Sequence, residues 1–379
     1  MTSAIPAKQR LLSLDFFRGF TVASMILVND PGDWGHIYEP LEHAKWNGCT
    51  FTDLIFPSFL FMVGISIVYA MESKKTDPAN HSKIIWHALR RMVTLILISW
   101  GIQFFYHPSL EHIHTLRFPG VLQRIAVVYF ICTILYLKTS ANTRKWIFAL
   151  ALIGYWVLMC FVPVPDGHPA NLEPETNFGA WVDRAVFGTN HLWSQSKTWD
   201  PEGLLGTIPA LGTCLFGIFI GTLIKKTDTD NQTKTAWLFT YGVIAIILGL
   251  VWGLFFPINK SLWTSSYVLY AGGISTLGLT LSYWFMDVQG YKKGVWPFLV
   301  FGMNAITGFI LAGLVPGIIN LFKVNYQGKE MGAAGYFYKT AIQPFFSPNT
   351  ASVIDAFLWV LLIWILMYPL YAKKIIIKV

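Results

Sequence analysis

The residues best suited to chemistry lie within residues 10–69. This stretch reads RLLSLDFFRGFTVASMILVNDPGDWGHIYEPLEHAKWNGCTFTDLIFPSFLFMVGISIVY, two long apolar runs joined by a polar loop. His43 lies in the loop, close to tryptophans and carboxylates, while Asp15, Arg18 and Asp53 lie inside or at the ends of the runs. Charged groups are expensive in hydrocarbon and usually mark function. The stretch therefore predicts an active site built into a membrane.

The composition indicates an integral membrane protein. The chain has 379 residues, of which 54% are hydrophobic and only 13% charged, whereas soluble domains carry about 25% charged residues. In such a protein an excess of Lys and Arg reports loops that face the cytoplasm, so the net charge of +8 does not indicate nucleic-acid binding. The start of the chain has no signal-peptide pattern, and we expect its first apolar run to remain in the mature protein.

About ten apolar runs predict an all-α fold, a single polytopic helical bundle over residues 1–379. Helices are expected because a spanning segment must satisfy its backbone groups internally. The weakest runs are 84–106, which contains arginines, and 262–285, which is rich in Gly and Ser. The expected spans are 12–29, 50–71, 84–106, 118–137, 146–162, 203–224, 235–256, 262–285, 295–318 and 352–372.

The positive charges of the loops predict the orientation. Alternate loops and the termini carry 16 Lys and Arg residues on one side and 8 on the other. The positive-inside rule then places both termini in the cytoplasm. Loops 30–49, 163–202 and 319–351 face outward, which in a bacterium is the periplasm, and the protein is expected in the inner membrane.

This topology gathers polar groups near the outer face, where they form a candidate pocket. Its members are Asn29, His43, Trp46, Asp53, Gln123, Arg124, Asp200 and Glu202. Each has a plainer alternative. Asp200-Pro201-Glu202 can cap the helix that follows, Arg124 can form a structural ion pair with Asp53, and Trp46 can belong to an interfacial belt. His43 can be an ordinary loop histidine.

A second polar set lies toward the inner face, and it comprises Arg18, Arg90, Arg91 and Asn304. Paired arginines suit phosphate binding. The alternatives are that Arg90 and Arg91 extend to the lipid headgroups and that Arg18 pairs with Asp15 nearly one helical turn away. No metal is expected. The four cysteines are dispersed, and the adjacent histidines His112 and His114 are not a typical ligand set.

Several motifs, in order, resemble the heparan-α-glucosaminide N-acetyltransferase family. They are SLDFFRG, LVND, LEHAKWNG running into TFTDLIFPSFLFMVG, GVLQRIAVVYF, WDPEGLLGTIPA and GMNAI. The resemblance implies a bacterial relative that moves an acetyl group from cytoplasmic acetyl-CoA to the amino group of a terminal glucosamine. It also implies that His43 is the active histidine and that Asn29 is its nearby asparagine.

The chemistry that we expect follows from these roles. His43 acts as a general base or is itself acetylated, Asp53, Asp200 or Glu202 orients the ring or holds the sugar's cation, and Asn29 or Arg124 stabilises the oxyanion. The inner arginines hold the CoA phosphates. The expected partners are the lipid bilayer and an amino-sugar acceptor, without nucleic acid, and a homodimer is a further expectation. The alternative function is a membrane transporter for an amino sugar or related solute.

Overall fold

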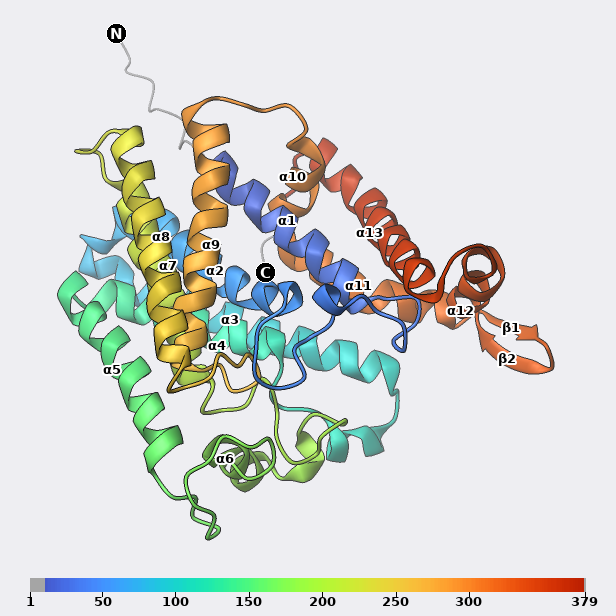
Figure 1. The fold of residues 1–379 in the computed structure, drawn as a ribbon. Coiled ribbons are helices and arrows are strands. Elements are labelled where there is room, and N and C mark those ends of the chain that lie inside the picture. The colour runs from blue at the N-terminus through green and yellow to red at the C-terminus, as the bar shows by residue number, and fades with distance from the viewer. Residues whose placement is uncertain (1–10, 378–379) are drawn as a thin grey trace.

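The computed structural model describes residues 11–377, which form a bundle of helices with one short hairpin (Figure 1). Lys8, Arg10 and Lys378, which the topology prediction counted, lie outside these residues. The helices of the first half are α1 (Leu12–Asn29), α2 (Phe51–Lys75), α3 (His81–Tyr106), α4 (Val121–Lys138), α5 (Ala141–Phe161) and α6 (Phe178–Phe187). The second half comprises α7 (Thr207–Lys225), α8 (Asn231–Gly253), α9 (Ser265–Tyr283), α10 (Trp296–Met303), α11 (Ala305–Asn320), the antiparallel strands β1 (Lys323–Tyr326) and β2 (Lys329–Gly332), α12 (Ala333–Phe337) and α13 (Pro348–Ala372).

The predicted all-α polytopic fold is confirmed. Within residues 11–377, eight helices are long and apolar enough to cross a membrane, and α10 with α11 forms a ninth candidate that bends by 85° at its break. The predicted run 262–285 corresponds to α9, which is not among these helices. Its hydroxyl groups bond to carbonyls one turn back, as Thr276 does to Gly272, which lets a polar helix lie buried. The count of ten and the cytoplasmic position of the termini stay predictions.

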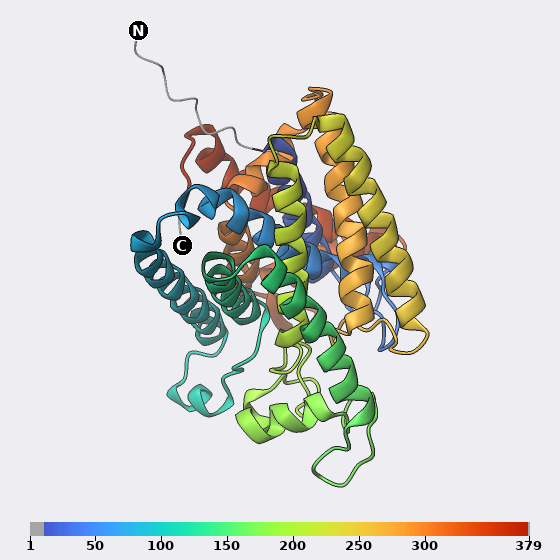
Figure 2. The same cartoon turned by 90° about the vertical axis from the view of Figure 1, so that its left-hand side faces the viewer.

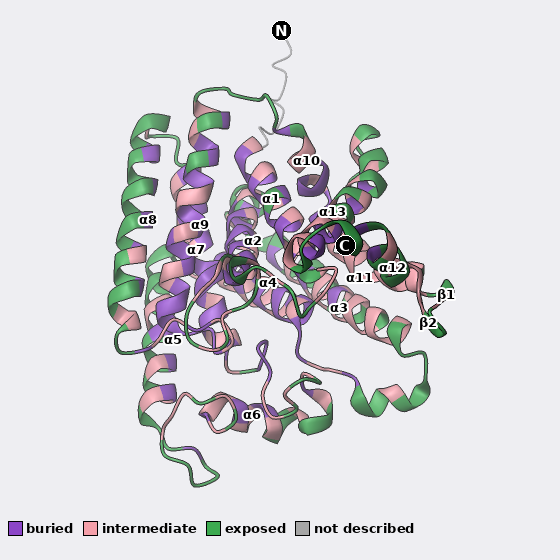
Figure 3. Ribbon diagram, turned by 45° about the vertical axis from the view of Figure 1, so that its right-hand side comes forward, coloured by how far each residue is buried: buried purple, intermediate pink, exposed green. Residues whose placement is uncertain are grey.

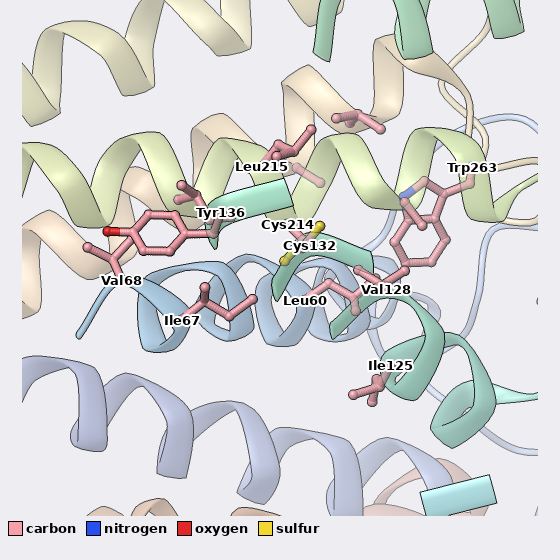
Figure 4. Packing of buried hydrophobic residues seen from close by; sticks show 14 of the residues in the cluster. Leu60, Ile67, Val68, Ile125, Val128, Cys132, Tyr136, Cys214, Leu215 and Trp263 are labelled. Atoms are coloured by element: carbon pink, nitrogen blue, oxygen red, sulfur yellow. The ribbon is translucent and has the colours of Figure 1, made fainter. Parts of the chain in front are cut away.

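Small residues bring the central helices into close contact. A Cβ atom added at Gly64 would lie 2.0 Å from the carbonyl oxygen of Cys214, and one at Gly217 would lie 2.0 Å from that of Phe61. Only hydrogen fits at these positions, so α2 and α7 pack backbone against backbone, as helices in membranes often do. Figure 4 shows Cys132 and Cys214 beside each other in this core, with Trp263 at one end.

The outer helices expose apolar side chains instead. α8 is exposed along most of its length (Figure 3), with Ile247 and Leu250 about half accessible. Figure 2 shows α8 side by side with α9, which it covers on one flank. An exposed apolar face on a spanning helix is the surface expected to meet lipid.

The loops gather at two ends of the bundle. The α7–α8 connection and the segment after α9 lie at the upper end of Figure 1, near the start of α1, whereas α6 and the loops around it lie at the lower end. The segment 163–202, which was predicted as a loop, contains the helix α6. α7 begins at Thr207 rather than at the predicted 203. The residues before it form a turn in which the N–H of Gly203 donates to the carbonyl of Asp200, and Arg124 donates to the carbonyls of Pro201 and Gly203.

Candidate active site

The start of α2 fixes a carboxylate under the loop that carries His43. Thr50 is the N-cap residue, and Asp53 is three residues into the helix, the spacing of a capping box. The Oδ2 atom of Asp53 accepts the backbone N–H groups of Thr50 at 3.0 Å and of Ala44 at 3.1 Å. The Thr50 hydroxyl donates to the carbonyl of Glu42 at 2.6 Å. Local sequence thus folds the residues on both sides of His43 onto one helix end.

His43 and Asp53 form a close pair. The Nδ1 atom of His43 lies 2.6 Å from Oδ1 of Asp53, whose side chain is 2% exposed, while the imidazole is 52% exposed. A carboxylate that accepts a hydrogen bond at Nδ1 holds the proton on that nitrogen and leaves Nε2 as the basic atom. The ring is therefore oriented by a buried group and presents its second nitrogen to a ligand.

A cavity of about 140 Å³ opens beside this pair, and we call it the histidine cavity. Asn29, at the end of α1, lines it together with His43, as does Lys260 from the loop between α8 and α9. Two hydroxyl residues, Thr21 and Thr52, also line it, and its other walls are apolar side chains of α1, α2, α3, α4 and α11. The structure thus brings together the three predicted catalytic residues, and it adds a lysine that the sequence reasoning missed.

Asp200 and Glu202 lie in an ion-pair network next to this cavity. Arg117 binds Asp200 through Nε at 2.8 Å and through a terminal nitrogen at 2.5 Å, and it reaches Glu202 at 2.6 Å. The other oxygen of Glu202 lies 3.5 Å from the ammonium of Lys260. Burial alone raises the pKa of Glu202, but Lys260, Arg117 and Arg124 outweigh it, so the pKa lies well below its usual range. The negative charges of both carboxylates are therefore compensated by cations of the protein. Neither carboxylate lines the histidine cavity, so the geometry does not support the expectation that they hold the sugar's cation.

Arg124 and Gln123 support the same turn from α4. Arg124 donates to the carbonyls of Pro201 at 3.1 Å and Gly203 at 2.7 Å, and its guanidinium lies 5.0 Å from the centre of the Trp263 ring. The alternative ion pair with Asp53 is not what the structure shows, because Asp53 is engaged by His43, Ala44 and Thr50. Gln123 is buried, and its amide has no hydrogen-bond partner among the described residues. Neither residue lines the histidine cavity.

Trp46 lies in the loop packing rather than in that cavity. Its indole nitrogen donates to the carbonyl of Leu172 at 2.9 Å, and its ring stacks edge-on to Trp199 at 5.0 Å. It lines a separate space of only about 20 Å³, together with Asp200. Trp46 thus connects the His43 loop to the long loop before α7.

The inner polar set lines one large cavity of about 810 Å³, which we call the arginine cavity. Arg18 donates to Asp15 at 3.0 Å, as the alternative predicted, and also to the Ser66 hydroxyl at 3.0 Å. Arg91 lies 4.7 Å from the centre of the Tyr129 ring, and its buried Nε has no hydrogen-bond partner among the described residues. Arg90 lines the same space. The clustering of these cations around an open volume favours ligand binding over extension into lipid headgroups.

Asn304 occupies the break between α10 and α11 and also lines the arginine cavity. Its amide nitrogen donates to the carbonyl of Ile375 at 2.8 Å, and its oxygen accepts the N–H of Ile377 at 2.8 Å. Irregular backbone at membrane depth is tolerated where it lines a cavity. Asn304 therefore holds the C-terminal segment as a wall of the cavity, instead of offering its amide to a ligand.

The two cavities adjoin one another. Both are lined by the same five apolar residues, which come from α2, α3, α4 and α11 and which are Phe59, Leu95, Ile125, Ala305 and Ile306. An apolar region thus lies between the arginines at one end and His43 at the other.

Comparison with known proteins identifies the family. The family model described as heparan-alpha-glucosaminide N-acetyltransferase, catalytic, matches residues 10–250. The chain belongs to this family. The heparan-alpha-glucosaminide N-acetyltransferase of Homo sapiens is 29% identical over 429 residues, an alignment that covers 100% of this chain and 61% of the human protein. That of Mus musculus is 31% identical over 355 residues, covering 79% of this chain and 53% of the mouse protein. The chain thus spans about three-fifths of the human relative and half of the murine one, and the predicted family is confirmed.

Proposed function

We propose that this member of the heparan-alpha-glucosaminide N-acetyltransferase family transfers an acetyl group from acetyl-CoA to the amino group of a glucosamine-type sugar. The observation that carries the proposal is the adjacency of the two cavities, with arginines at one end and the His43–Asp53 pair at the other. The acceptor class comes from the names of the relatives.

The arginine cavity suits the nucleotide end of acetyl-CoA. Guanidinium groups pair with phosphate oxygens in a planar, bidentate manner, and Arg18, Arg90 and Arg91 all face this volume. The buried Nε of Arg91 supports the assignment because an unsatisfied buried donor is costly and a phosphate oxygen would satisfy it. Under the predicted topology this end faces the cytoplasm.

The apolar region between the cavities suits the acyl-bearing arm. The phosphates of CoA cannot enter hydrocarbon, but an uncharged arm reaching roughly 15 Å, half the thickness of a bilayer core, carries the thioester to mid-depth. Phe59 and Leu95, which line both cavities, present apolar surface to such an arm. The acetyl group then reaches the histidine cavity while the nucleotide stays among the arginines.

At the histidine cavity, His43 serves as the base. The amine nitrogen of the sugar attacks the carbonyl carbon of the thioester, and Nε2 of His43 takes a proton from that nitrogen. A C–N bond forms, the C–S bond breaks, and His43 returns the proton to the departing sulfur, so that CoA leaves as the thiol. Asp53 stabilises the imidazolium that exists between these transfers. Asn29 lines the same cavity, and in this proposal its amide donates to the carbonyl oxygen.

The test is acetyl transfer by the purified full chain in detergent. Radiolabelled acetyl-CoA is supplied with glucosamine, with N-acetylglucosamine as the control that has no free amine. We expect label on glucosamine only. Folded protein that binds acetyl-CoA but labels no amino sugar would overturn the proposal, and solute uptake by vesicles of the same protein would favour the transporter alternative. Label that stays on the protein without acceptor, and is lost in His43→Ala, would replace the base role by an acetyl-histidine step.

A further inference from the structure

Lys260 lies on the loop between α8 and α9, which is hydrogen-bonded to the loop that carries His43. Gly48 donates its N–H to the carbonyl of Ile258 at 2.7 Å, and the amide of Asn259 donates to the side chain of Asn47 at 3.2 Å. The other end of the Asn259 side chain accepts the N–H of Leu262 at 2.8 Å. Asn47 and Gly48, which follow His43, therefore position the loop of Lys260, although Lys260 is far from them in the sequence.

The ammonium of Lys260 is held by one ion pair and retains donors for a further hydrogen bond. Its side chain is 14% exposed, and its one ion-pair partner among the described residues is Glu202, at 3.5 Å. Glu202 also accepts from Arg117, so a single carboxylate is shared between two cations. An ammonium has three N–H donors, and Lys260 lines the same cavity of about 140 Å³ as His43 and Asn29. The network thus holds a positive charge at the wall of this small space.

We propose that Lys260 binds the carbonyl oxygen of the acyl donor in the histidine cavity, an assignment that rests on the proposed acetyl transfer. When the amine attacks, the carbonyl π electrons move onto oxygen, and the N–H of Lys260 stabilises the charge that forms there. The ammonium keeps its proton throughout, while the amine proton passes through His43 to the departing sulfur. Lys260 takes the role that the sequence offered to Arg124, whose donors are occupied by the carbonyls of Pro201 and Gly203.

The first experiment separates turnover from binding. For Lys260→Met we expect kcat to fall about 10²-fold, with KM for acetyl-CoA within about threefold of wild type. Lys260→Arg, which retains the charge, should recover part of that loss, and Lys260→Gln repeats the test if the methionine variant does not fold. Lys329→Met, on the exposed strand β2, is the matched control and should behave as wild type.

A double variant distinguishes this role from a structural one. If Lys260 served only to neutralise Glu202, then Glu202→Gln would remove the need for it, and Glu202→Gln with Lys260→Met would regain activity. We expect the double variant to remain as slow as Lys260→Met. Recovery to the level of Glu202→Gln alone would overturn the assignment.

A spectroscopic readout is independent of turnover. The probe is a CoA ketone analogue with a ¹³C-labelled carbonyl and a methylene between that carbon and sulfur, which cannot transfer its acyl group. Bound to wild type, its carbonyl stretch should lie at lower frequency than in buffer, and Lys260→Met but not Lys329→Met should reverse most of that shift. Equal shifts in all three proteins would overturn the proposal for Lys260 alone, whereas a wild-type protein that acetylates no amino sugar would overturn the proposed function itself.

Discussion

The two adjoining cavities differ in how their polar groups are satisfied. At the histidine end, Asp53 accepts hydrogen bonds from three residues, and Arg117 binds Asp200 and Glu202 together. At the arginine end, cations surround about 810 Å³ of open space, and Arg91 retains a buried donor without a partner among the described residues. A preorganised network favours chemistry because it costs no rearrangement during the reaction. The unsatisfied donor of Arg91 favours the capture of an anion from outside.

Removing the reactive ring is the strongest test of this contrast. His43→Ala should lower kcat by about 10⁴-fold, the upper part of the range for general acid–base groups, while leaving folding and acetyl-CoA binding intact. The matched control is His36→Ala, since His36 lies in the same loop and pairs with Asp33 at 2.8 Å, but its partner carboxylate is 33% exposed and the ring does not line the histidine cavity. Radiolabel transfer by both variants decides the matter, and near wild-type turnover by His43→Ala would refute the assignment.

Disturbing the support of the ring should have the next largest effect. Asp53→Asn presents an amide to Nδ1, which favours the tautomer with its proton on Nε2 and removes the base. We expect kcat to fall about 10³-fold with little change in KM for acetyl-CoA. Asp33→Asn is the control. An equal loss in both variants, or a loss confined to KM, would contradict an orienting role for Asp53.

Breaking the ion-pair network should reduce stability more than binding. Arg117→Met leaves Asp200 without its bidentate partner and Glu202 with Lys260 alone, and we expect a loss of about 3 kcal/mol in the free energy of unfolding. Because the pKa of Glu202 is lowered in the fold, its contribution is present above its ordinary pKa of 4.5 and is lost as the pH falls below that value. Denaturant unfolding in detergent at pH 7 and at pH 4 should therefore show a smaller difference between wild type and variant at the lower pH. A difference that grows on acidification would contradict this account.

At the arginine end we expect an effect on binding rather than on chemistry. Arg90→Met with Arg91→Met should raise KM for acetyl-CoA about 10-fold and leave kcat within about threefold. Affinity in the wild type should also weaken with added salt, as expected of partly exposed charges. Lys138→Met, an exposed lysine at the end of α4, is the control. A fall in kcat at unchanged KM would assign these arginines to another task.

The orientation of the two cavities relative to the membrane can be tested by thiol labelling, which needs no activity measurement. Cys49 is a poor target for labelling because burial and the charge of Asp53 raise its pKa to about 12, which leaves little thiolate at neutral pH. Trp34→Cys is better placed, since Trp34 is 68% exposed in the loop between α1 and α2. A membrane-impermeant thiol reagent should label it from the periplasmic side of intact cells. Labelling from the cytoplasmic side alone would reverse the predicted topology.

Sequence reasoning was most successful where the signal is local. His43 and Asp53 were expected near one level of the membrane because a short loop joins them, and the structure pairs them through the helix cap that Thr50 and Asp53 form. Arg90 and Arg91 were assigned to an inner polar set because charges inside an apolar run usually mark function, and the structure places both at one cavity. By contrast, Arg117 entered only as one positive loop charge, since nothing near it indicates two carboxylates more than 80 residues away.

The amino-acid sequence by itself determined that this chain is an all-α membrane protein of this family, because hydrophobicity, motif order and helix caps are properties of neighbouring residues. Only the tertiary structure decided which charged side chains line a cavity and which pair with one another. In the sequence, the carboxylates of Asp200 and Glu202 cannot be told apart from that of Asp53, but in the structure Arg117 pairs with both of them. Lys260 reaches the histidine cavity because its loop is hydrogen-bonded to Asn47 and Gly48. Long-range pairing of this kind depends on how helices pack, and no local pattern encodes it.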